Sequence, residues 1–490
     1  MQAKSFATKS LRFIDLFAGM GGFHRALAAL GHECVMASEL DEELRELYLK
    51  NFPSMTGKVF GDIRQAKQHV PRHDVLCGGF PCQPFSKSGA QLGTQDETRG
   101  TLFHEILEIL EKHRPTYVLL ENVGNFGRHD LGRTWQIVKR RLEALGYEVA
   151  GTEHSTPPSS TDWRDSGLGA DAKRLALPET EIQLGQGLLS PHHFGFPHHR
   201  ERFFIVASLK GLPDMPFPPR QKDADTTVAS VVQRQSEIAK AERAEVSLTL
   251  QQVACIEAWN KLVQRIPSRI PFPAAPIWSD EFRFPYPFES NTPFSAPLHQ
   301  LKRALGRAGK NDSREALLEM LPNYAREPVD QFRQWKINYI EKNRSWWRRI
   351  EGLAPSGWLG EISEMPPSLR KLEWNVKDGE RDIWKYVLQF RPSGLRVKRY
   401  SSIPALVAMT TTQIPILGPE RRFLTKVEGL RLQGFPDDHL LSVSRARSFK
   451  ALGNGVHVGI VKLIAERLLG GAAGARSIGK TRRAQENLVL

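Results

Sequence analysis

The sequence contains little cysteine. Its 490 residues include four cysteines, and no two of them form a CxxC pair. This excludes a disulfide framework and a cysteine-rich zinc module. No stretch approaches the roughly 20 apolar residues that span a bilayer, and the initial segment MQAKSFATKS has no apolar core of a signal peptide. We therefore expect a protein of a reducing compartment, cytoplasmic and without a membrane anchor.

Acidic residues are also outnumbered. Lys and Arg total 68 against 54 Asp and Glu, which gives a net charge of +14. A surplus of this size favours polyanionic partners, with nucleic acid first, although a merely basic surface is the alternative. The hydrophobic and charged fractions, 40% and 25%, are those of an ordinary globular protein, and the length predicts more than one domain.

Short apolar strands alternate with amphipathic helices over the first 207 residues. This alternation predicts an α/β domain of the doubly wound, Rossmann-like type, with a mainly parallel sheet and ligands at its carboxyl edge. We expect it to span residues 10–207, with an inserted surface loop at about 152–190. The predicted strands are 11–17, 33–38, 75–78, 117–120 and 203–207, and the predicted helices 24–30, 41–51 and 102–113.

The composition changes after residue 207. Residues 208–400 hold 31 Lys and Arg against 23 Asp and Glu, and eight of the ten tryptophans. Proline-punctuated pieces such as FRFPYPFESNTPF fit neither long helices nor a regular sheet, so we expect a second, irregular domain. Two basic clusters there could contact phosphates or simply be solvated, and the tryptophans could equally form a core. The clusters are Lys302, Arg303, Arg307 and Lys310, and the run 391–399.

A glycine-rich turn, DLFAGMGG, follows the first strand and opens a helix. Its backbone can approach a nucleotide closely, although a purely structural turn is the alternative. A dinucleotide fingerprint starting at Gly19 would need a third glycine where this chain has His24. Glu39, at the end of the second strand, is placed to hold ribose hydroxyls. The pattern predicts a nucleoside ligand without a pyrophosphate.

One cysteine stands apart from the other three. Cys82 lies between two prolines in GGFPCQPFS, just after the strand 75–78. A rigid loop at the ligand edge of the sheet suits an exposed nucleophile. Cys34, Cys77 and Cys255 lie in apolar surroundings, so we expect them to be buried and inert.

Charged residues mark two further sites. Glu121 ends another apolar strand, and beside Cys82 it would act as an acid or hydrogen-bond donor with its pKa raised by burial. Arg200 and Arg202 alternate along an extended segment and could clamp a carboxylate and an anionic or carbonyl group. No cysteine or carboxylate set matches the neighbouring histidines, so we expect no metal site. These histidines are His192, His193, His198 and His199.

Taken in order, these motifs resemble the DNA cytosine-5 methyltransferase family. They are DLFAGMGGF, ASELD, GDI, GGFPCQPFSKSG, ENV, PHHRER, RRFLTKVEGLRLQGFPD and KALGNGV. The resemblance covers 11–123, 188–207 and about 404–469. It implies a catalytic domain that binds S-adenosylmethionine and a target-recognition domain at 208–403. Residues 404–448 would carry a family motif, 449–470 would return as a helix to complete the catalytic domain, and 471–490 would form a basic tail.

The resemblance also assigns roles. Cys82 would add to C6 of a cytosine flipped out of duplex DNA, Glu121 would hydrogen-bond or protonate N3, and Arg202 would orient Glu121 and contact the base carbonyl. Arg200 would belong to the same catalytic set. The pocket for S-adenosylmethionine would be formed by Phe17, Gly19, Gly21, Gly22, Glu39, Asp62, Ile63, Pro81, Leu102 and Asn454.

The chain departs from the family pattern at His198, where the family usually has Gln, so support of the active-site loop could be altered or pH-sensitive. Without chromatin-reading modules, we expect a bacterial or phage enzyme, a monomer that either shares its site with a restriction endonuclease or acts alone. Three alternatives stay open: an enzyme acting on a tRNA cytosine, a non-catalytic DNA-binding module, and an NAD-dependent oxidoreductase, which His24 disfavours.

Overall fold

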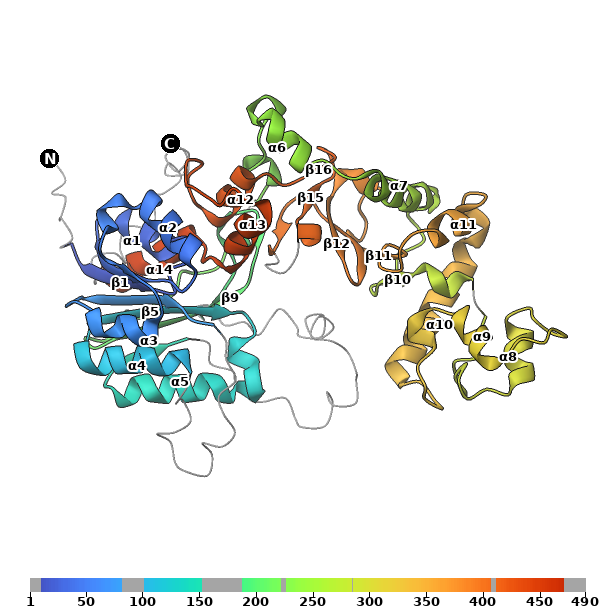
Figure 1. The fold of residues 1–490 in the computed structure, drawn as a ribbon, viewed down its shortest axis with the longest axis horizontal. Coiled ribbons are helices and arrows are strands. Elements are labelled where there is room, and N and C mark those ends of the chain that lie inside the picture. Colours follow the sequence, from blue (N-terminus) through green and yellow to red (C-terminus); the bar gives the residue numbers. More distant parts are fainter. Residues whose placement is uncertain are drawn as a thin grey trace.

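The computed structural model describes residues 10–81, 101–151, 187–221, 226–283, 285–406 and 411–470. Figure 1 shows an α/β part, which contains the first strands and the last helices, and a second part formed by the middle of the chain. In the described residues no helix is long and apolar enough to cross a membrane.

An eight-stranded sheet forms the centre of the α/β part. Its order is β3-β2-β1-β4-β5-β9-β6, with β7 also paired to β9. The first five strands pair in parallel, and β9 runs antiparallel to β5, β6 and β7. This confirms the predicted doubly wound fold. The strands are β1 (Arg12–Leu16), β2 (Glu33–Ser38), β3 (Val59–Phe60), β4 (Val75–Gly79), β5 (Tyr117–Val123), β6 (Glu148–Ala150), β7 (Leu188–Leu189) and β9 (Arg202–Ser208).

Helices cover both faces of this sheet, as Figure 1 shows. One face packs on α3 (Ile63–Ala66), α4 (Leu102–His113) and α5 (Arg133–Ala144), and the other on α1 (Gly22–Ala28), α2 (Glu42–Asn51) and α14 (Val458–Leu469). Successive residues of β1 point into the two cores alternately. Phe13 packs in the core on the α1 side of the sheet, and Ile14 packs in the core on the α4 side. This alternation is the two-residue period of a strand buried on both faces.

The end of the chain differs from the expectation of one helix over 449–470. It forms two helices, α13 (Arg445–Asn454) and α14, separated at residues 455–457. The His457 side chain accepts a hydrogen bond from the Ile460 amide, and this cap starts a new helix. The break places a loop beside the glycine-rich turn, with Val456 against Gly22.

The second part is more regular than the sequence predicts. A six-stranded sheet runs in the order β10-β11-β13-β12-β15-β16. The proline-rich stretch after residue 284 is indeed irregular, but the same part also contains the long helices α7 and α10. The strands are β10 (Ile277–Trp278), β11 (Lys371–Asn375), β12 (Val387–Arg391), β13 (Gly394–Lys398), β15 (Ile416–Leu417) and β16 (Arg422–Phe423). The helices are α6 (Lys240–Glu245), α7 (Leu250–Arg265), α8 (Leu298–Ala304), α9 (Arg314–Glu319), α10 (Gln334–Ile350), α11 (Trp358–Ser363) and α12 (Lys426–Gln433).

Tryptophans form much of the core of this second part. Trp259 packs edge-on against Trp358 with ring centroids 5.3 Å apart, and Trp347 lies 5.9 Å from Trp358. All three are buried. The core alternative for these residues is therefore correct: their rings hold α7, α10 and α11 together.

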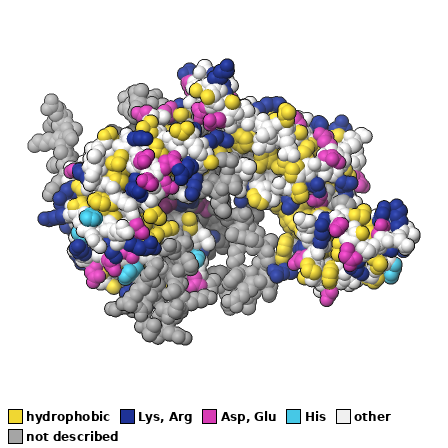
Figure 2. Space-filling model, in the orientation of Figure 1, with side chains coloured by type: hydrophobic (Ala, Val, Ile, Leu, Met, Phe, Trp, Pro, Cys, Tyr) yellow, Lys and Arg dark blue, Asp and Glu magenta, His cyan; other side chains and the backbone are white. Residues whose placement is uncertain are grey.

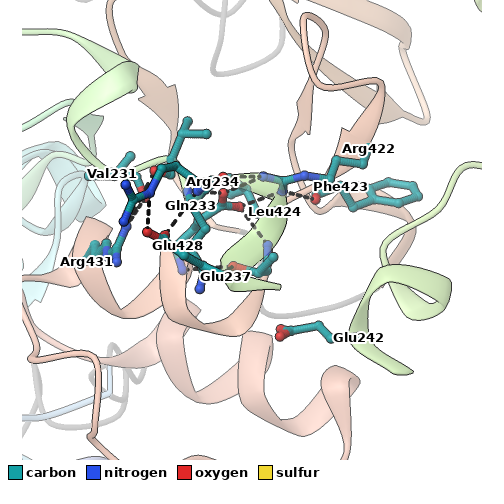
Figure 3. A network of polar contacts seen from close by, with 12 residues as sticks. Val231, Gln233, Arg234, Glu237, Glu242, Arg422, Phe423, Leu424, Glu428 and Arg431 are labelled. Carbon is teal, nitrogen blue, oxygen red and sulfur yellow. Dashed lines mark hydrogen bonds and ion pairs between the residues drawn. The ribbon is translucent and has the colours of Figure 1, made fainter. Parts of the chain in front are cut away.

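A pair of short strands joins the parts. These strands, β8 (His198–His199) and β14 (Ile403–Pro404), pair in parallel. Within the second part, Arg422 and Glu428 form a buried ion pair of 2.7 Å. The amide of Gln233 donates to the same carboxylate, so one side chain ties residues from the start of the second part to β16 and α12 (Figure 3).

Candidate active site

The carboxyl ends of the parallel strands converge on one edge of the sheet. The glycine-rich turn follows β1, Glu39 follows β2, Asp62 follows β3 and Pro81 follows β4. Glu121 lies near the end of β5. This edge is where ligands bind in open α/β sheets. The fold thus brings the residues predicted for a cofactor and those predicted for catalysis to the same place.

The turn after β1 has an unusual backbone. Phe17 has φ +56° and Gly19 has φ +54°, both in the left-handed region. For a bulky residue such as Phe17 this conformation is strained, and strain of this kind concentrates at functional sites. The Phe17 ring lies 3.6 Å from where a side chain at Gly78 would begin, so the turn sits directly over the end of β4.

Three amides of this turn are already occupied. Ala18 N donates to the Ser38 carbonyl at 2.9 Å, Gly21 N to the Ala18 carbonyl at 2.8 Å, and Gly19 N to Glu39 Oε2 at 2.8 Å. These groups do not form an open cradle for phosphate, and a carboxylate stands beside them. The geometry agrees with a nucleoside ligand that has no pyrophosphate, and it disfavours the oxidoreductase alternative.

His24 has a structural role. It is 6% exposed, its ring stacks on Phe52 at 3.8 Å, and its Nδ1 lies 2.8 Å from the Tyr48 hydroxyl. Burial lowers the pKa of His24 to about 4. Its amide donates to the buried carboxylate of Asp15, whose pKa burial raises. This polar layer beneath the turn was not predicted, because the spacing of DLFAGMGGFH does not reveal which side chains point inward.

Two of the predicted cofactor glycines serve packing. A side chain on Gly21 would begin 2.4 Å from the Phe52 ring, and one on Gly22 would begin 2.6 Å from Val456. The missing side chains therefore let α1 lie close to its neighbours. Asn454, predicted to line the same pocket, is the exposed last residue of α13, just before the loop that contains Val456. The structure brings this loop and the turn into contact.

Glu39 bridges two backbone amides, with Oε2 on Gly19 and Oε1 on Asp41. Each oxygen keeps a further lone pair for ribose hydroxyls. Asp62 caps α3 by accepting from the Arg64 amide at 2.9 Å, and the next residue, Ile63, is buried in the core. The sequence reading missed Leu40, which is 72% exposed beside Glu39.

Glu121 and Arg202 form the central pair of the predicted catalytic set. Arg202 Nε lies 2.9 Å from Glu121 Oε1, and β5 and β9 bring the two together. Glu121 is 6% exposed. Burial raises the pKa of Glu121, against the opposing effect of Arg202 and Arg200. The predicted direction of the pKa is therefore confirmed, and it favours the protonated carboxyl.

The Glu121 carboxyl faces the strand that leads to Cys82. A side chain on Gly79 would begin 3.3 Å from Glu121 Oε2. Asn122, which is buried, donates to the Phe80 carbonyl at 2.9 Å and so fixes the end of β4 against β5. Cys82 itself lies outside the described residues, as does the inserted segment 152–186. Pro81, the last described residue before Cys82, is exposed.

Arg200 does not face the same pocket as Arg202. It is 1% exposed, and its guanidinium donates to the carbonyls of Gly453 and Gly455, both at 2.7 Å. The two arginines were predicted to bind a carboxylate and an anionic or carbonyl group. Arg202 binds the carboxylate of Glu121, and Arg200 binds backbone carbonyls. The described hydrogen bonds of Arg200 thus go to the segment around the loop between α13 and α14, and its expected catalytic role stays a prediction.

The remaining cysteines and histidines behave as core residues. Cys34, Cys77 and Cys255 are buried, and burial raises the pKa of each thiol, that of Cys255 to about 12. They are thus poor nucleophiles, as predicted. Within the described ranges no group of three or more His, Cys, Asp or Glu is arranged to hold a metal ion. His192 instead stacks on His199 at 4.3 Å.

Known proteins match this chain over nearly its whole length. The family of C-5 cytosine-specific DNA methylases matches residues 11–161 and 177–470. The type II methyltransferase M.AluI of Cellulosimicrobium cellulans is 33% identical over 502 residues, covering 94% of this chain and 92% of that protein. The type II methyltransferase M.HhaI of Haemophilus parahaemolyticus is 47% identical over 148 residues, covering 30% of this chain and 44% of that protein. The solved S. pombe Dnmt2 methyltransferase is 15% identical, with a TM-score of 0.41, covering 94% of this chain and 99% of that one. The chain belongs to the C-5 cytosine-specific DNA methyltransferase family.

Proposed function

We propose that this enzyme transfers a methyl group from S-adenosylmethionine to C5 of a cytosine that is flipped out of a specific duplex DNA sequence. The observation that carries the proposal is the buried Glu121–Arg202 pair, next to the residues that lead to Cys82 and on the same sheet edge as the turn. Neither a thiol nor a cofactor can reach a stacked base, so the target must leave the helix.

The residues at the sheet edge fit S-adenosylmethionine. The carboxylate of Glu39 would bind the ribose hydroxyls, Asp62 and Ile63 would bind the adenine, and exposed Leu40 would cover one side of it. Phe17, Gly19, Pro81, Leu102 and Asn454 would line the rest of the pocket. When bound, the cofactor supplies an electrophilic methyl group.

The protein residues make the cytosine reactive. C5 is a weak nucleophile until the Cys82 thiolate adds to C6, which breaks the 5,6 double bond and places electron density on C5. A protonated Glu121 would donate to N3 and withdraw charge from C6, while Arg202 holds the carboxyl in place and contacts the base carbonyl. C5 then takes the methyl group, a base removes the C5 proton, and Cys82 leaves as the double bond re-forms.

The second part of the chain would read the DNA sequence. On the face shown in Figure 2, dark blue side chains gather at the far end of the helices α8 and α9. Some basic groups there are already engaged: Arg307 pairs with Asp312 at 2.8 Å, and Lys302 donates to the Lys310 carbonyl. Arg303 and Lys310 are exposed, and such groups position DNA through its phosphates.

Two relatives are type II methyltransferases by name, which supports a role in restriction and modification. We propose that the enzyme acts as a monomer and protects the site of a restriction endonuclease. An enzyme that acts alone would have the same chemistry, so the presence of a nuclease of the same specificity decides between the two.

Transfer of a labelled methyl group tests the proposed function. Wild-type protein and the variant Cys82→Ala are incubated with labelled S-adenosylmethionine and either duplex DNA or tRNA. We expect label in DNA as 5-methylcytosine with wild-type protein, and none with the variant. Label in tRNA alone would favour the RNA enzyme, and DNA binding without label would favour a non-catalytic binder.

A further inference from the structure

Two buried side chains hold the loop between α13 and α14 by its backbone. Arg200 donates to the carbonyls of Gly453 and Gly455, and Gln433, which is 0% exposed, donates to those of Leu452 and Gly455. The two side chains therefore share the Gly455 carbonyl, although one comes from the end of β8 and the other from α12. Together they fix three backbone carbonyls around Asn454, those of Leu452, Gly453 and Gly455.

This loop lies directly against the glycine-rich turn. A side chain on Gly22 would begin 2.6 Å from Val456 Cγ1, and one on Gly455 would begin 3.1 Å from the Met20 methyl. The loop and the turn are therefore packed so closely that neither glycine could carry a side chain without a shift of its neighbour. A shift of the loop would therefore move Asn454 relative to the turn where the cofactor is proposed to bind.

Two buried histidines adjoin the same group, and their partners fix their tautomers. His198 Nδ1 lies 2.9 Å from the Leu432 carbonyl, which only accepts, so Nδ1 carries the proton and Nε2 is an acceptor. His457 Nδ1 accepts from the Ile460 amide, so Nε2 of the neutral ring carries the proton and is a donor. The two rings lie 6.4 Å apart, centroid to centroid.

Each of these four side chains has one buried polar atom without a partner in the part of the chain that the structure describes. The donors are Arg200 Nε and His457 Nε2, and the acceptors are His198 Nε2 and Gln433 Oε1. Two donors and two acceptors match the four hydrogen bonds of a water molecule, which accepts two and donates two. Buried waters typically occupy sites of this kind, with two to four polar partners.

We propose that Arg200, Gln433, His198 and His457 enclose one internal water molecule and together act as positioning residues that set the affinity for the cofactor through the loop 453–456. The inference rests on the proposed cofactor site. It assigns Arg200 to cofactor binding, although Arg202, two residues along the chain, belongs to the base pocket. His198 stands where the family usually has Gln, and here its free Nε2 is one of the two acceptors for the water.

A crystal structure of the wild-type protein at a resolution that shows ordered water tests the first half. We expect one water within hydrogen-bond distance of all four atoms. A dry site, or direct pairing of the four atoms with one another, would overturn it. This measurement needs no activity, so it stands apart from the success or failure of the proposed function.

Arg200→Lys tests the second half, because lysine keeps the charge but cannot bond two carbonyls as a fork. Titration calorimetry with S-adenosylhomocysteine should show Kd raised about tenfold or more, with kcat at saturating cofactor within about threefold of wild type. Arg220→Lys is the matched control, since Arg220 also donates to a backbone carbonyl, that of Leu188, away from the loop. Its Kd should match wild type.

The other outcomes decide against the inference. An unchanged Kd with a large fall in kcat would make Arg200 catalytic, and no change in either would leave it without a positioning role. If Arg200→Lys does not fold, Gln433→Met replaces it, with the same expected rise in Kd. If the wild-type protein does not bind S-adenosylhomocysteine at all, the proposed function fails. This result differs from the two outcomes above, in which the wild-type protein binds and only the role of Arg200 is decided.

Discussion

Glu121 shows how one residue acquires a chemical role from its surroundings. Its carboxyl is buried at the end of β5, where burial raises its pKa and Arg202 fixes one oxygen. A raised pKa favours the protonated carboxyl, which can donate a hydrogen bond to a ring nitrogen. The same residue on an exposed strand end would be an ordinary solvated carboxylate.

Replacing this carboxyl should slow the chemistry more than the binding. For Glu121→Gln we expect kcat to fall roughly 10²- to 10⁴-fold, because an amide can donate to N3 but cannot transfer a proton. The Kd for duplex DNA should stay within about threefold. Single-turnover methyl transfer and a DNA-binding titration measure the two quantities.

Glu105→Gln is the control for this variant. Glu105, on α4, is also buried, but it pairs with Lys67, which directly follows α3. Replacing its carboxyl should therefore leave kcat unchanged. Equal loss of rate in both variants would mean that the effect of Glu121 is general destabilisation.

Residue roles could be predicted from the sequence where a motif stands at a strand end. Glu121 is of this kind. Its pairing with Arg202 was implied by the family resemblance, and the inert cysteines were predicted from their apolar surroundings. The partner of Arg200 could not be predicted, because Gly453 and Gly455 lie about 250 positions away and are joined to it only by the fold. Leu40 was missed because its exposure depends on the path of the chain after β2.

At the scale of elements, helix starts are fixed by caps that the sequence displays. Asp41 caps α2, Thr101 caps α4, and Thr425 with Glu428 forms a reciprocal capping box at α12. The helices predicted at 41–51 and 102–113 match α2 and α4 to within a residue. The single helix over 449–470 that the resemblance implies is broken before α14, where the histidine cap is a weak sequence signal.

The α12 capping box also contains a buried charge. Glu428 is 0% exposed and accepts from Arg422 and from the amides of Gln233 and Thr425 (Figure 3). Glu428→Gln would leave the Arg422 guanidinium buried without its counter-charge. We expect the free energy of unfolding to fall by about 3–5 kcal/mol, measured by urea denaturation.

A surface ion pair between α12 and the segment that follows it provides the comparison. Arg431 and Asp437 are 27% and 52% exposed, so Asp437→Asn should cost about 0–1 kcal/mol. Similar losses for both variants would show that burial gives the Glu428 network no greater weight than a surface ion pair.

For the whole molecule, the alternation of strands and helices predicted the α/β part well, because both faces of its sheet are buried and its strands read as short apolar runs. The second part was predicted less well. Its strands are short, β10 pairs with β11 across almost 100 residues, and proline-rich segments lie between its helices, so no local period reveals the sheet. The tryptophans that hold it together were visible in the sequence, but their partners were not.

Buried histidines make the stability of the whole molecule depend on pH. Burial lowers the pKa of five of them from the ordinary value of 6.5 to about 3 or 4: His24, His73, His192, His439 and His457. Below pH 6.5 these histidines bind protons in the unfolded chain but stay neutral in the native chain, because their native pKa values are lower. The free energy of unfolding should therefore fall as pH drops below 6.5, and the loss should be absent above it.

Denaturation at several pH values measures this effect. Each fully buried histidine should contribute up to about 1.4 kcal/mol per pH unit below 6.5. The variant His439→Gln should have a smaller slope, since it removes a ring buried beside Arg25. A stability that stays constant from about pH 8 to about pH 5 would contradict the burial of these rings.

The central claim is that Cys82 attacks C6 of a cytosine in duplex DNA. Duplex DNA in which the target cytosine has fluorine at C5 tests it most directly, because the base that must remove the C5 proton finds none and the enzyme cannot leave. With S-adenosylmethionine present, we predict a stable covalent complex whose mass is the sum of protein, DNA and one methyl group, linked through Cys82 and absent in Cys82→Ala. Methylation of ordinary DNA without any such complex, or a link through another cysteine, would contradict the account.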